Sequence, residues 1–312
     1  MRPALILLAI LSAACSNNLQ EQKPDPVSPK DGLRLVVVSP SAAEMLAELG
    51  MLERIVGIGD FVSRPPGLNR LPRVGPYNAP NIEKVLDLRA DILVTVRSEA
   101  ARASNARLRD LGVEVLELDT SHWEGTRQAL RTLGDRLDLG ESAGEILASL
   151  DEAMTTIRQR AEGSPSPKVL FVVGRDPLYV AGPGSHIDAM IQTAGGTNIA
   201  ADSDSPYQLV SLETMLQRLP EVIIDTSDNG PDALRGRLPG PWDTWDFLPA
   251  VRENRVFWID PDLLVIPGIR LPAMTERMGR LIHPEIFGDP VEADFEPSPE
   301  PGPTETTIED SP

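Results

Sequence analysis

Short apolar runs alternate with amphipathic stretches along most of the chain from Leu33 onward. Apolar runs of strand length occur at 35–38, 54–59, 91–95, 114–118, 169–173 and 221–224. Helical spacing of apolar residues occurs at 42–49, 81–88, 101–111 and 186–194. Strands that alternate with helices in this way predict an α/β fold, in which parallel strands are covered by helices.

A long helical stretch lies between two such regions. It extends from about Ser121 to Glu162 and is interrupted at 138–140. In its second half, four apolar residues recur three or four positions apart: Ile146, Leu150, Met154 and Ile157. This spacing predicts an amphipathic helix. The helix should end at the Gly- and Pro-containing loop 163–167, after which a second α/β region begins.

The second region repeats the first in register. Asn-Ile-Glu-Lys-Val-Leu at 81–86 corresponds to Ser-Leu-Glu-Thr-Met-Leu at 211–216, and the apolar run 91–94 corresponds to 221–224. In both copies an Asn or Ser can cap a helix, and a Glu lies in the first turn. The sequence therefore predicts two related Rossmann-like lobes joined by a single long α-helix.

The N-terminus has the pattern of an export signal. Met1-Arg2 precedes an apolar run from Ala4 to Leu11, and small residues follow as far as Cys15. The run is too short to span a bilayer but fits a signal peptide. Cys15 is the only cysteine and lies where a bacterial lipoprotein signal is acylated, so we expect lipidation there. The alternative is an ordinary secretory signal in which Cys15 is incidental.

Polar segments flank the folded region. The segment after Cys15 is rich in Pro and charged residues, and the C-terminal end consists largely of Pro, Glu, Asp, Ser and Thr, so neither can form a core. The predicted organisation is a signal peptide at 1–15, a flexible tether at 16–32, an N-terminal α/β lobe at 33–138, a linker helix and loop at 139–166, a C-terminal α/β lobe at 167–288 and a disordered acidic tail at 289–312.

Charge and motifs argue against several functions. The formal net charge of −18 disfavours nucleic acid, which requires clustered Lys and Arg. Gly57-Ile58-Gly59 lacks the third glycine of a dinucleotide fingerprint, and the sequence has neither a Walker A lysine motif nor a Gly-x-Ser-x-Gly elbow. An exported hydrolase is therefore disfavoured, and we expect no catalytic residues. His122, His186 and His283 are too far apart to predict a metal site, and each is expected at a surface or capping position.

Five short motifs follow one another in the N-terminal region: Ser39-Pro40-Ser41-Ala42-Ala43-Glu44, Arg54-Ile55-Val56-Gly57-Ile58, Pro65-Pro66, Leu71-Pro72-Arg73-Val74-Gly75 and Asn81-Ile82-Glu83-Lys84-Val85-Leu86-Asp87-Leu88. Their order resembles the helical-backbone class (class III) of periplasmic binding proteins, and the resemblance extends over 33–287. That class serves ABC importers of cobalamin, haem and ferric siderophores. The resemblance implies a non-enzymatic protein on the extracytoplasmic side of a membrane, with two α/β lobes bridged by one long helix.

The resemblance also assigns two glutamates to the permease. In cobalamin-binding members a Glu on each lobe docks into arginine pockets of the permease, and Glu83 and Glu213 match these positions. A carboxylate fixed on a first helical turn can pair with an Arg of the partner. The alternative is that both residues only complement the dipoles of their helices.

In this class the ligand lies between the lobes, on loops that follow strands. The matching positions carry aromatic residues and an arginine: Phe61, Tyr77, Tyr179, Tyr207 and Arg270. Flat rings suit a large planar ligand. The expected ligand is a corrinoid of the cobalamin type, with no resident cofactor or metal. Trp242 and Trp245 fit either the rim of the cleft or a structural corner.

Two other ligands remain open. Cobalamin binders carry a Trp where this chain has Val96, and this departure keeps two alternatives to a corrinoid. Haem is one alternative, because haem-binding relatives use a tyrosine ligand in the loop that contains Tyr77. A ferric siderophore is the other, since anionic chelates need cationic side chains, here Arg64, Arg97, Arg175 and Arg270.

Overall fold

The computed structural model describes residues 32–227, 236–237, 242, 244–264 and 266–291. Leu33 and the residues after it form one unit, distinct from Met1–Gly32. The predicted signal peptide with Cys15 and all of the predicted tether except Gly32 lie outside the described residues, as does the predicted tail beyond Val291. In the part of the chain that the structure describes, no helix combines the length and the apolar character that a membrane span needs.

The first sheet contains only parallel strands, in the order β2-β1-β3-β4. The strands are β1 (Leu35–Val37), β2 (Ile55–Ile58), β3 (Ile92–Val96) and β4 (Glu114–Leu118), and the helices between them are α1 (Pro40–Glu48), α2 (Ile82–Asp87) and α3 (Arg102–Asp110). Leu35 and Val37 pack into one core cluster, whereas Val36 and Val38 pack into another. Both faces of this sheet are therefore covered, which explains the uninterrupted apolar run of β1.

The second sheet is larger and mixed, in the order β10-β11-β9-β5-β6-β8, with β7 paired to β5. Its strands are β5 (Lys168–Arg175), β6 (Leu178–Ala181), β7 (Thr197–Asn198), β8 (Tyr207–Leu209), β9 (Val222–Asp225), β10 (Gly236–Arg237) and β11 (Val256–Trp258). Its helices are α6 (His186–Thr193), α7 (Leu212–Arg218), α8 (Pro249–Arg252), α9 (Pro261–Leu264), α10 (Leu271–Ile282) and α11 (Pro284–Phe287). Strands β9, β5 and β11 are parallel, and the antiparallel β6 and β8 extend the sheet on one side.

Two helices, α4 (Trp123–Arg136) and α5 (Gly140–Ala161), occupy the predicted helical stretch, and they are separated at the predicted break. The turn between them includes Asp138 with φ of 59°, a left-handed conformation. The helices approach each other closely, since a Cβ added to Gly134 would lie 2.5 Å from the Cβ of Ala143. The break therefore redirects the chain and packs the two helices together.

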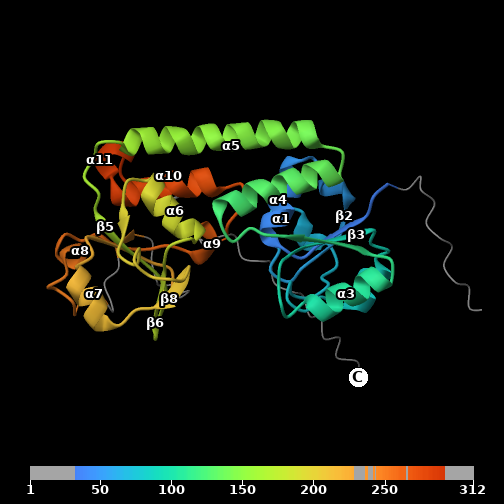
Figure 1. The fold of residues 1–312 in the computed structure, drawn as a ribbon, viewed down its shortest axis with the longest axis horizontal. Coiled ribbons are helices and arrows are strands. Elements are labelled where there is room, and N and C mark those ends of the chain that lie inside the picture. Colours follow the sequence, from blue (N-terminus) through green and yellow to red (C-terminus); the bar gives the residue numbers. More distant parts are fainter. Residues whose placement is uncertain (1–31, 228–235, 238–241, 243, 265, 292–312) are drawn as a thin grey trace, which may run out of the picture. The chain divides into compact units, whose positions relative to one another are not determined.

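Helix α5 joins the two α/β regions because its apolar stripe enters both cores. Leu147 is buried in a core cluster of the first sheet, and Met154 is buried in a cluster of the second. Figure 1 shows α5 running along the helices of both sheets, with α10 beneath one half and α4 beneath the other. We call β1 to α4 the first lobe and β5 to α11 the second lobe. The predicted fold, two α/β lobes joined by one long helix, is confirmed.

Candidate functional site

Two tyrosines of the second lobe form a stacked pair. Tyr179 on β6 and Tyr207 on β8 have ring centroids 6.2 Å apart and planes inclined by 24°. Tyr179 is 38% exposed, whereas Tyr207 is half-buried against the core of its lobe. Burial, and to a lesser extent Tyr179, raise the pKa of Tyr207 to about 12, so this residue stays a neutral phenol near neutral pH. The pair, called the tyrosine platform below, offers a flat surface to a ligand.

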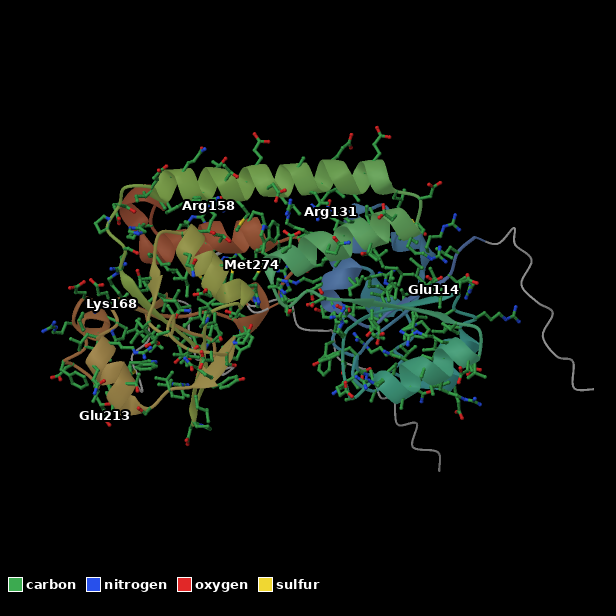
Figure 2. The ribbon with its side chains drawn as sticks, viewed as in Figure 1. Glu114, Arg131, Arg158, Lys168, Glu213 and Met274 are labelled. Carbon is green, nitrogen blue, oxygen red and sulfur yellow. The ribbon has the colours of Figure 1, made fainter. Side chains whose placement is uncertain are left out.

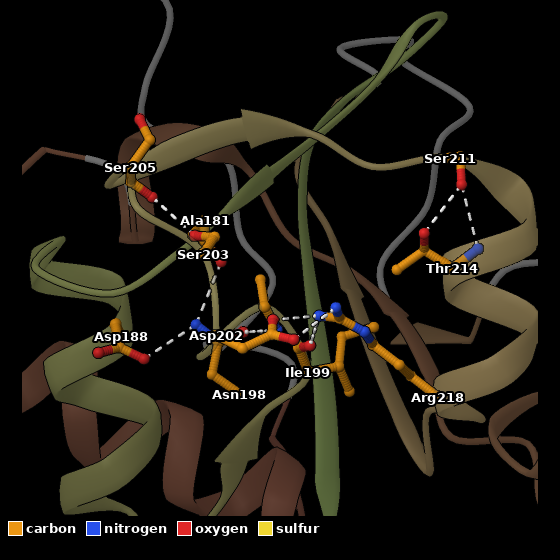
Figure 3. Close-up of polar contacts among 11 residues, drawn as sticks. Ala181, Asp188, Asn198, Ile199, Asp202, Ser203, Ser205, Ser211, Thr214 and Arg218 are labelled. Carbon is orange, nitrogen blue, oxygen red and sulfur yellow. Dashed lines mark hydrogen bonds and ion pairs between the residues drawn. The ribbon is translucent and has the colours of Figure 1, made fainter.

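Internal hydrogen bonds position the strand that carries Tyr207. The hydroxyl of Ser205 donates to the carbonyl oxygen of Tyr207 at 2.8 Å. The side-chain amide of Asn198 donates to the carbonyl oxygen of Ala181 at 3.1 Å and to Oδ1 of Asp188 at 2.9 Å, which ties β6 to α6 (Figure 3). The platform is therefore held by its own lobe, as a preformed binding surface must be.

The two aromatic residues predicted from the first lobe lie on loops that are tied together. Phe61, after β2, is 63% exposed, and Tyr77, in the following loop, is 37% exposed. The N–H of Asp60 donates to the carbonyl oxygen of Gly75 at 3.1 Å, and Nη1 of Arg73 donates to the carbonyl oxygen of Asp60 at 2.8 Å. Within the described residues, no ring contact joins either aromatic residue to the tyrosine platform.

Arg270 connects the lobes. It precedes α10 in the second lobe, and its Nε lies 2.8 and 2.9 Å from the two carboxylate oxygens of Glu44 on α1 of the first lobe. The residues before Arg270 follow the same path, since Ile269 packs against a first-lobe core and a Cβ on Gly268 would lie 3.5 Å from the Cβ of Ser41. The sequence predicted Arg270 as a ligand contact but did not predict its ion pair with Glu44.

Sequence reasoning also missed a polar network at the end of β9. Asp225 is fully buried, and its Oδ2 accepts the indole N–H of Trp242 at 2.8 Å and lies 3.4 Å from Nε of Arg175. Its Oδ1 accepts the hydroxyl of Ser227 at 2.5 Å, and Arg175 donates to the same hydroxyl at 2.8 Å. A carboxylate directly after the apolar run 222–224 was the available signal, because a buried charge requires partners.

A cavity of about 430 Å³ lies beside this network, lined by Arg175, Asp176, Pro177, Leu178, Val210, Met215, Trp242 and Trp245. None of the five residues predicted to contact a ligand lines this cavity. Trp242 is 5% exposed and belongs to a core cluster, and Trp245 donates its backbone N–H to the carbonyl oxygen of Trp242 at 2.9 Å. Of the two alternatives for this tryptophan pair, the structure favours the structural corner.

The histidines do not gather at one site. His122 is exposed at the start of α4, as expected. His186 is 2% exposed, so a surface position is wrong for this residue, and its Nε2 lies 3.3 Å from the carbonyl oxygen of Leu264, the last residue of α9. His283 is 1% exposed at the junction of α10 and α11, with Nδ1 2.7 Å from Oε1 of Glu285. Among the described residues, no group of three potential metal ligands occurs.

Glu83 and Glu213 occupy equivalent places in the two lobes. Each is the second residue of a short helix, α2 or α7, and both side chains are exposed. The side chains of Asn81 and Ser211 cap these helices and accept the N–H of the third helical residue at 3.0 and 3.1 Å. Helix α2 leads to β3 and α7 leads to β9, as the repeat predicts. Figure 2 shows Glu213 on the outer side of α7.

A family profile adds to this geometry. The profile of the periplasmic binding protein family matches residues 35–263, a stretch that contains the greater part of both lobes. The chain belongs to the periplasmic binding protein family. The class that the sequence motifs resemble is thereby confirmed.

Individual relatives cover most of the chain. An uncharacterized ABC transporter substrate-binding lipoprotein of Bacillus subtilis, YvrC, is 24% identical over 310 residues, which cover 91% of this chain and 96% of the relative. The vitamin B12-binding protein of Salmonella paratyphi A is 29% identical over 191 residues, which cover 61% of this chain and 71% of the relative.

Among solved structures, the periplasmic haem-binding protein BhuT, in complex with two haems, is 27% identical. It aligns with a TM-score of 0.68 over 84% of this chain and 99% of that chain. By name, these relatives are a substrate-binding lipoprotein of an ABC transporter, a vitamin B12-binding protein and a haem-binding protein.

Proposed function

We propose that the protein captures a corrinoid of the cobalamin type between its lobes and delivers it to the permease of an ABC importer. The observation that carries this proposal is the tyrosine platform, Tyr179 stacked on Tyr207. Two rings held on neighbouring strands bury a broad flat ligand without ordering flexible side chains. Similarity to a vitamin B12-binding protein supports the choice of ligand. Phe61, Tyr77 and Arg270 complete the proposed site.

Three of the four arginines considered for an anionic chelate already face carboxylates of the chain. Arg175 lies 3.4 Å from the Asp225 carboxylate, Arg270 lies 2.8 Å from the Glu44 carboxylate, and Nη1 of Arg97 lies 3.8 Å from Oδ2 of Asp119. Each of these cationic groups faces a carboxylate of the chain itself, so a polyanionic ferric siderophore would have to compete with it. A corrinoid, whose peripheral groups are mostly amides, does not need a net positive site.

Haem is the second candidate, and the similarity to BhuT favours it. Tyr77 is the tyrosine that would serve as the axial ligand, because its loop is exposed and matches the loop that haem-binding relatives use. Tyr207 is poorly suited to this role, because burial raises its pKa to about 12 and disfavours a phenolate.

Delivery is proposed to use Glu83 and Glu213. Both carboxylates are exposed on capped helices, so their positions are fixed by the two lobes. Arginines of the permease would pair with them. The α5 helix favours a small closing motion over a large one, because a helix resists bending.

The protein is proposed to act on the extracytoplasmic face of a membrane, held by a lipid on Cys15. The lipoprotein name of a relative similar over 91% of the chain supports this anchor. We expect Cys15→Ser to release the protein from the membrane fraction, since acyl chains would supply the anchor. Cell fractionation and mass analysis of the mature N-terminus measure this. Unchanged retention, with no lipid mass on the wild type, would contradict the anchor.

Equilibrium titration identifies the ligand. The four tryptophans of the chain report binding of cyanocobalamin, haem or a ferric siderophore through quenching of their fluorescence. We expect cyanocobalamin to bind more tightly than the other two. Tight haem binding with a tyrosinate spectrum that Tyr77→Phe abolishes would select the second candidate. Binding of none of the three would refute the proposed function.

A further inference from the structure

The cavity of about 430 Å³ lies behind the strands that carry the tyrosine platform. In the β6–β8 pair, Tyr179 lies opposite Leu209, and this face of the pair carries the platform. Successive side chains of a strand point to opposite faces, so Leu178 and Val210 lie on the other face. Both of these residues line the cavity. A ligand in the cavity would therefore contact a different surface from a ligand on the platform.

Two indole rings line this cavity, and contacts within the second lobe hold them. Nε1 of Trp242 donates to Oδ2 of Asp225 at 2.8 Å, and Asp225 is fully buried. Trp245 packs against Phe247, with ring centroids 5.8 Å apart. Much of the remaining lining is apolar and includes Met215 of α7. Indole rings fixed in a cavity of this size suit a flat aromatic ring.

A smaller cavity of about 210 Å³ adjoins the first one at Val210, which lines both. Helix α7 also contributes to both, with Met215 in the first and the preceding residue, Thr214, in the second. The polar side chains that line the second cavity are those of Asp202, Ser203, Gln208, Ser211, Thr214 and Arg218. An aromatic surface and a surface rich in hydroxyls therefore lie next to each other.

The ionised side chains among the described lining residues of the smaller cavity neutralise each other. The two Nη atoms of Arg218 each lie 2.8 Å from a carboxylate oxygen of Asp202, and Arg218 also donates to the carbonyl oxygen of Ile199 (Figure 3). The side-chain amide of Gln208 has no hydrogen-bond partner within the described residues, so it can both donate to and accept from a ligand. We therefore expect a neutral group that carries hydrogen-bonding atoms.

We propose that the two cavities together form a site for a nucleoside-type group, a flat heteroaromatic base joined to a sugar. The base lies against Trp242 and Trp245, and the sugar hydroxyls bind the amide of Gln208 and the hydroxyls beside it. The inference goes beyond the proposed function, because a free nucleoside can bind there without a corrinoid. The nucleotide arm of a cobalamin offers the same chemistry and is the second possible source.

Isothermal titration calorimetry of the full chain with two nucleosides tests the site. The probes are adenosine and α-ribazole, the nucleoside contained in cobalamin. Gln208→Leu removes the amide and keeps the approximate size of the side chain, and Trp245→Leu removes one indole wall. Gln217→Leu is the matched control, because Gln217 is exposed on α7 and is not among the described residues that line either cavity. Far-UV circular dichroism confirms folding.

We expect the wild type to bind at least one of the two nucleosides. Gln208→Leu should weaken this binding about fivefold, because neutral hydrogen bonds are lost. Trp245→Leu should weaken it about tenfold, because the base loses an aromatic ring on which it stacks. Gln217→Leu should leave the affinity unchanged. If Trp245→Leu does not fold, Gln208→Leu decides, since Gln208 is partly exposed on the edge strand.

Two corrinoids identify the source of the nucleoside group: cyanocobalamin and dicyanocobinamide, which lacks the nucleotide arm. If the site holds the arm of a cobalamin, Gln208→Leu and Trp245→Leu weaken binding of cyanocobalamin and leave binding of the cobinamide unchanged. If the site holds a free nucleoside, both variants weaken nucleoside binding alone.

The proposal is overturned if Gln208→Leu and Trp245→Leu change the affinity for none of the four probes by more than Gln217→Leu does. Failure of the proposed function is a separate result. If the wild type binds neither corrinoid, the corrinoid function loses its support, while the two nucleoside titrations still decide the site.

Discussion

Each lobe contributes a buried carboxylate that faces an arginine, and the two pairs differ in what they connect. Asp225 and Arg175 both belong to the second lobe, and Asp225 is fully buried with Trp242 and Ser227 as further donors. Glu44 belongs to the first lobe, whereas its partner Arg270 belongs to the second. The first pair can only stabilise one lobe. The second depends on how the lobes meet, so a ligand between them can influence it.

The comparison predicts its largest effect at Asp225. Asp225→Ala leaves the guanidinium of Arg175 and the indole N–H of Trp242 without this acceptor, so the free energy of unfolding should fall by about 3–5 kcal/mol. Asp202→Ala is the control, because that side chain is 71% exposed in its pair with Arg218. Its loss should lower the free energy of unfolding by less than about 1 kcal/mol. Urea denaturation measures both. Equal losses would contradict a special role for the buried network.

The next effect concerns the permease. Glu83→Ala and Glu213→Ala, combined, should leave ligand affinity unchanged and weaken binding to the permease by about 2–5 kcal/mol, because permease arginines would lose their partners. Glu53→Ala with Glu221→Ala removes the same charge elsewhere on the two lobes and serves as the control. Binding to the reconstituted permease and uptake by cells measure the effect. Normal uptake by the Glu83 and Glu213 variant would refute the docking role.

Loss of the tyrosine platform should cost less free energy than the change at Asp225 or the double change at Glu83 and Glu213. Tyr207→Ala removes the buried half of the stacked pair, so ligand affinity should fall by about 1–3 kcal/mol, the value of one large buried side chain. Phe247→Ala is the control, since Phe247 is exposed in the same lobe and was not assigned to the ligand. Titration with cyanocobalamin compares the two. An intact affinity in Tyr207→Ala would remove the platform from the site.

The sequence predicted the elements whose signal is local. The first-sheet strands, the break between α4 and α5, and the capped helices that carry Glu83 and Glu213 each have their pattern within a few residues. Strands β6 and β8, which extend the second sheet on one side by antiparallel pairing, were not predicted. The Glu44–Arg270 pair spans 226 positions, and no periodicity links residues so far apart. The ligand set stays a prediction from resemblance, and neither resemblance nor local pattern indicated this charge pair.

The smallest effect is a spectroscopic one, and it tests the difference between the lobes at a single phenol. The pKa of Tyr207 is raised from 10.0 to about 12, chiefly by burial in the second lobe. The neutral form is favoured by folding, so this contribution to stability is complete below pH 10 and is lost as the pH rises through about 12.

An absorbance titration of tyrosinate in the native protein should therefore contain a late phase near pH 12. Tyr207→Phe should remove that phase, whereas Tyr77→Phe in the first lobe should leave it in place. Bound ligand should delay the phase further, because a ligand that stacks on the platform excludes more water from the phenol. If the late phase survives Tyr207→Phe, it does not come from the phenol of Tyr207, and this ring then titrates like one in a surface loop. The contrast between a preformed second-lobe surface and exposed first-lobe loops would then not hold.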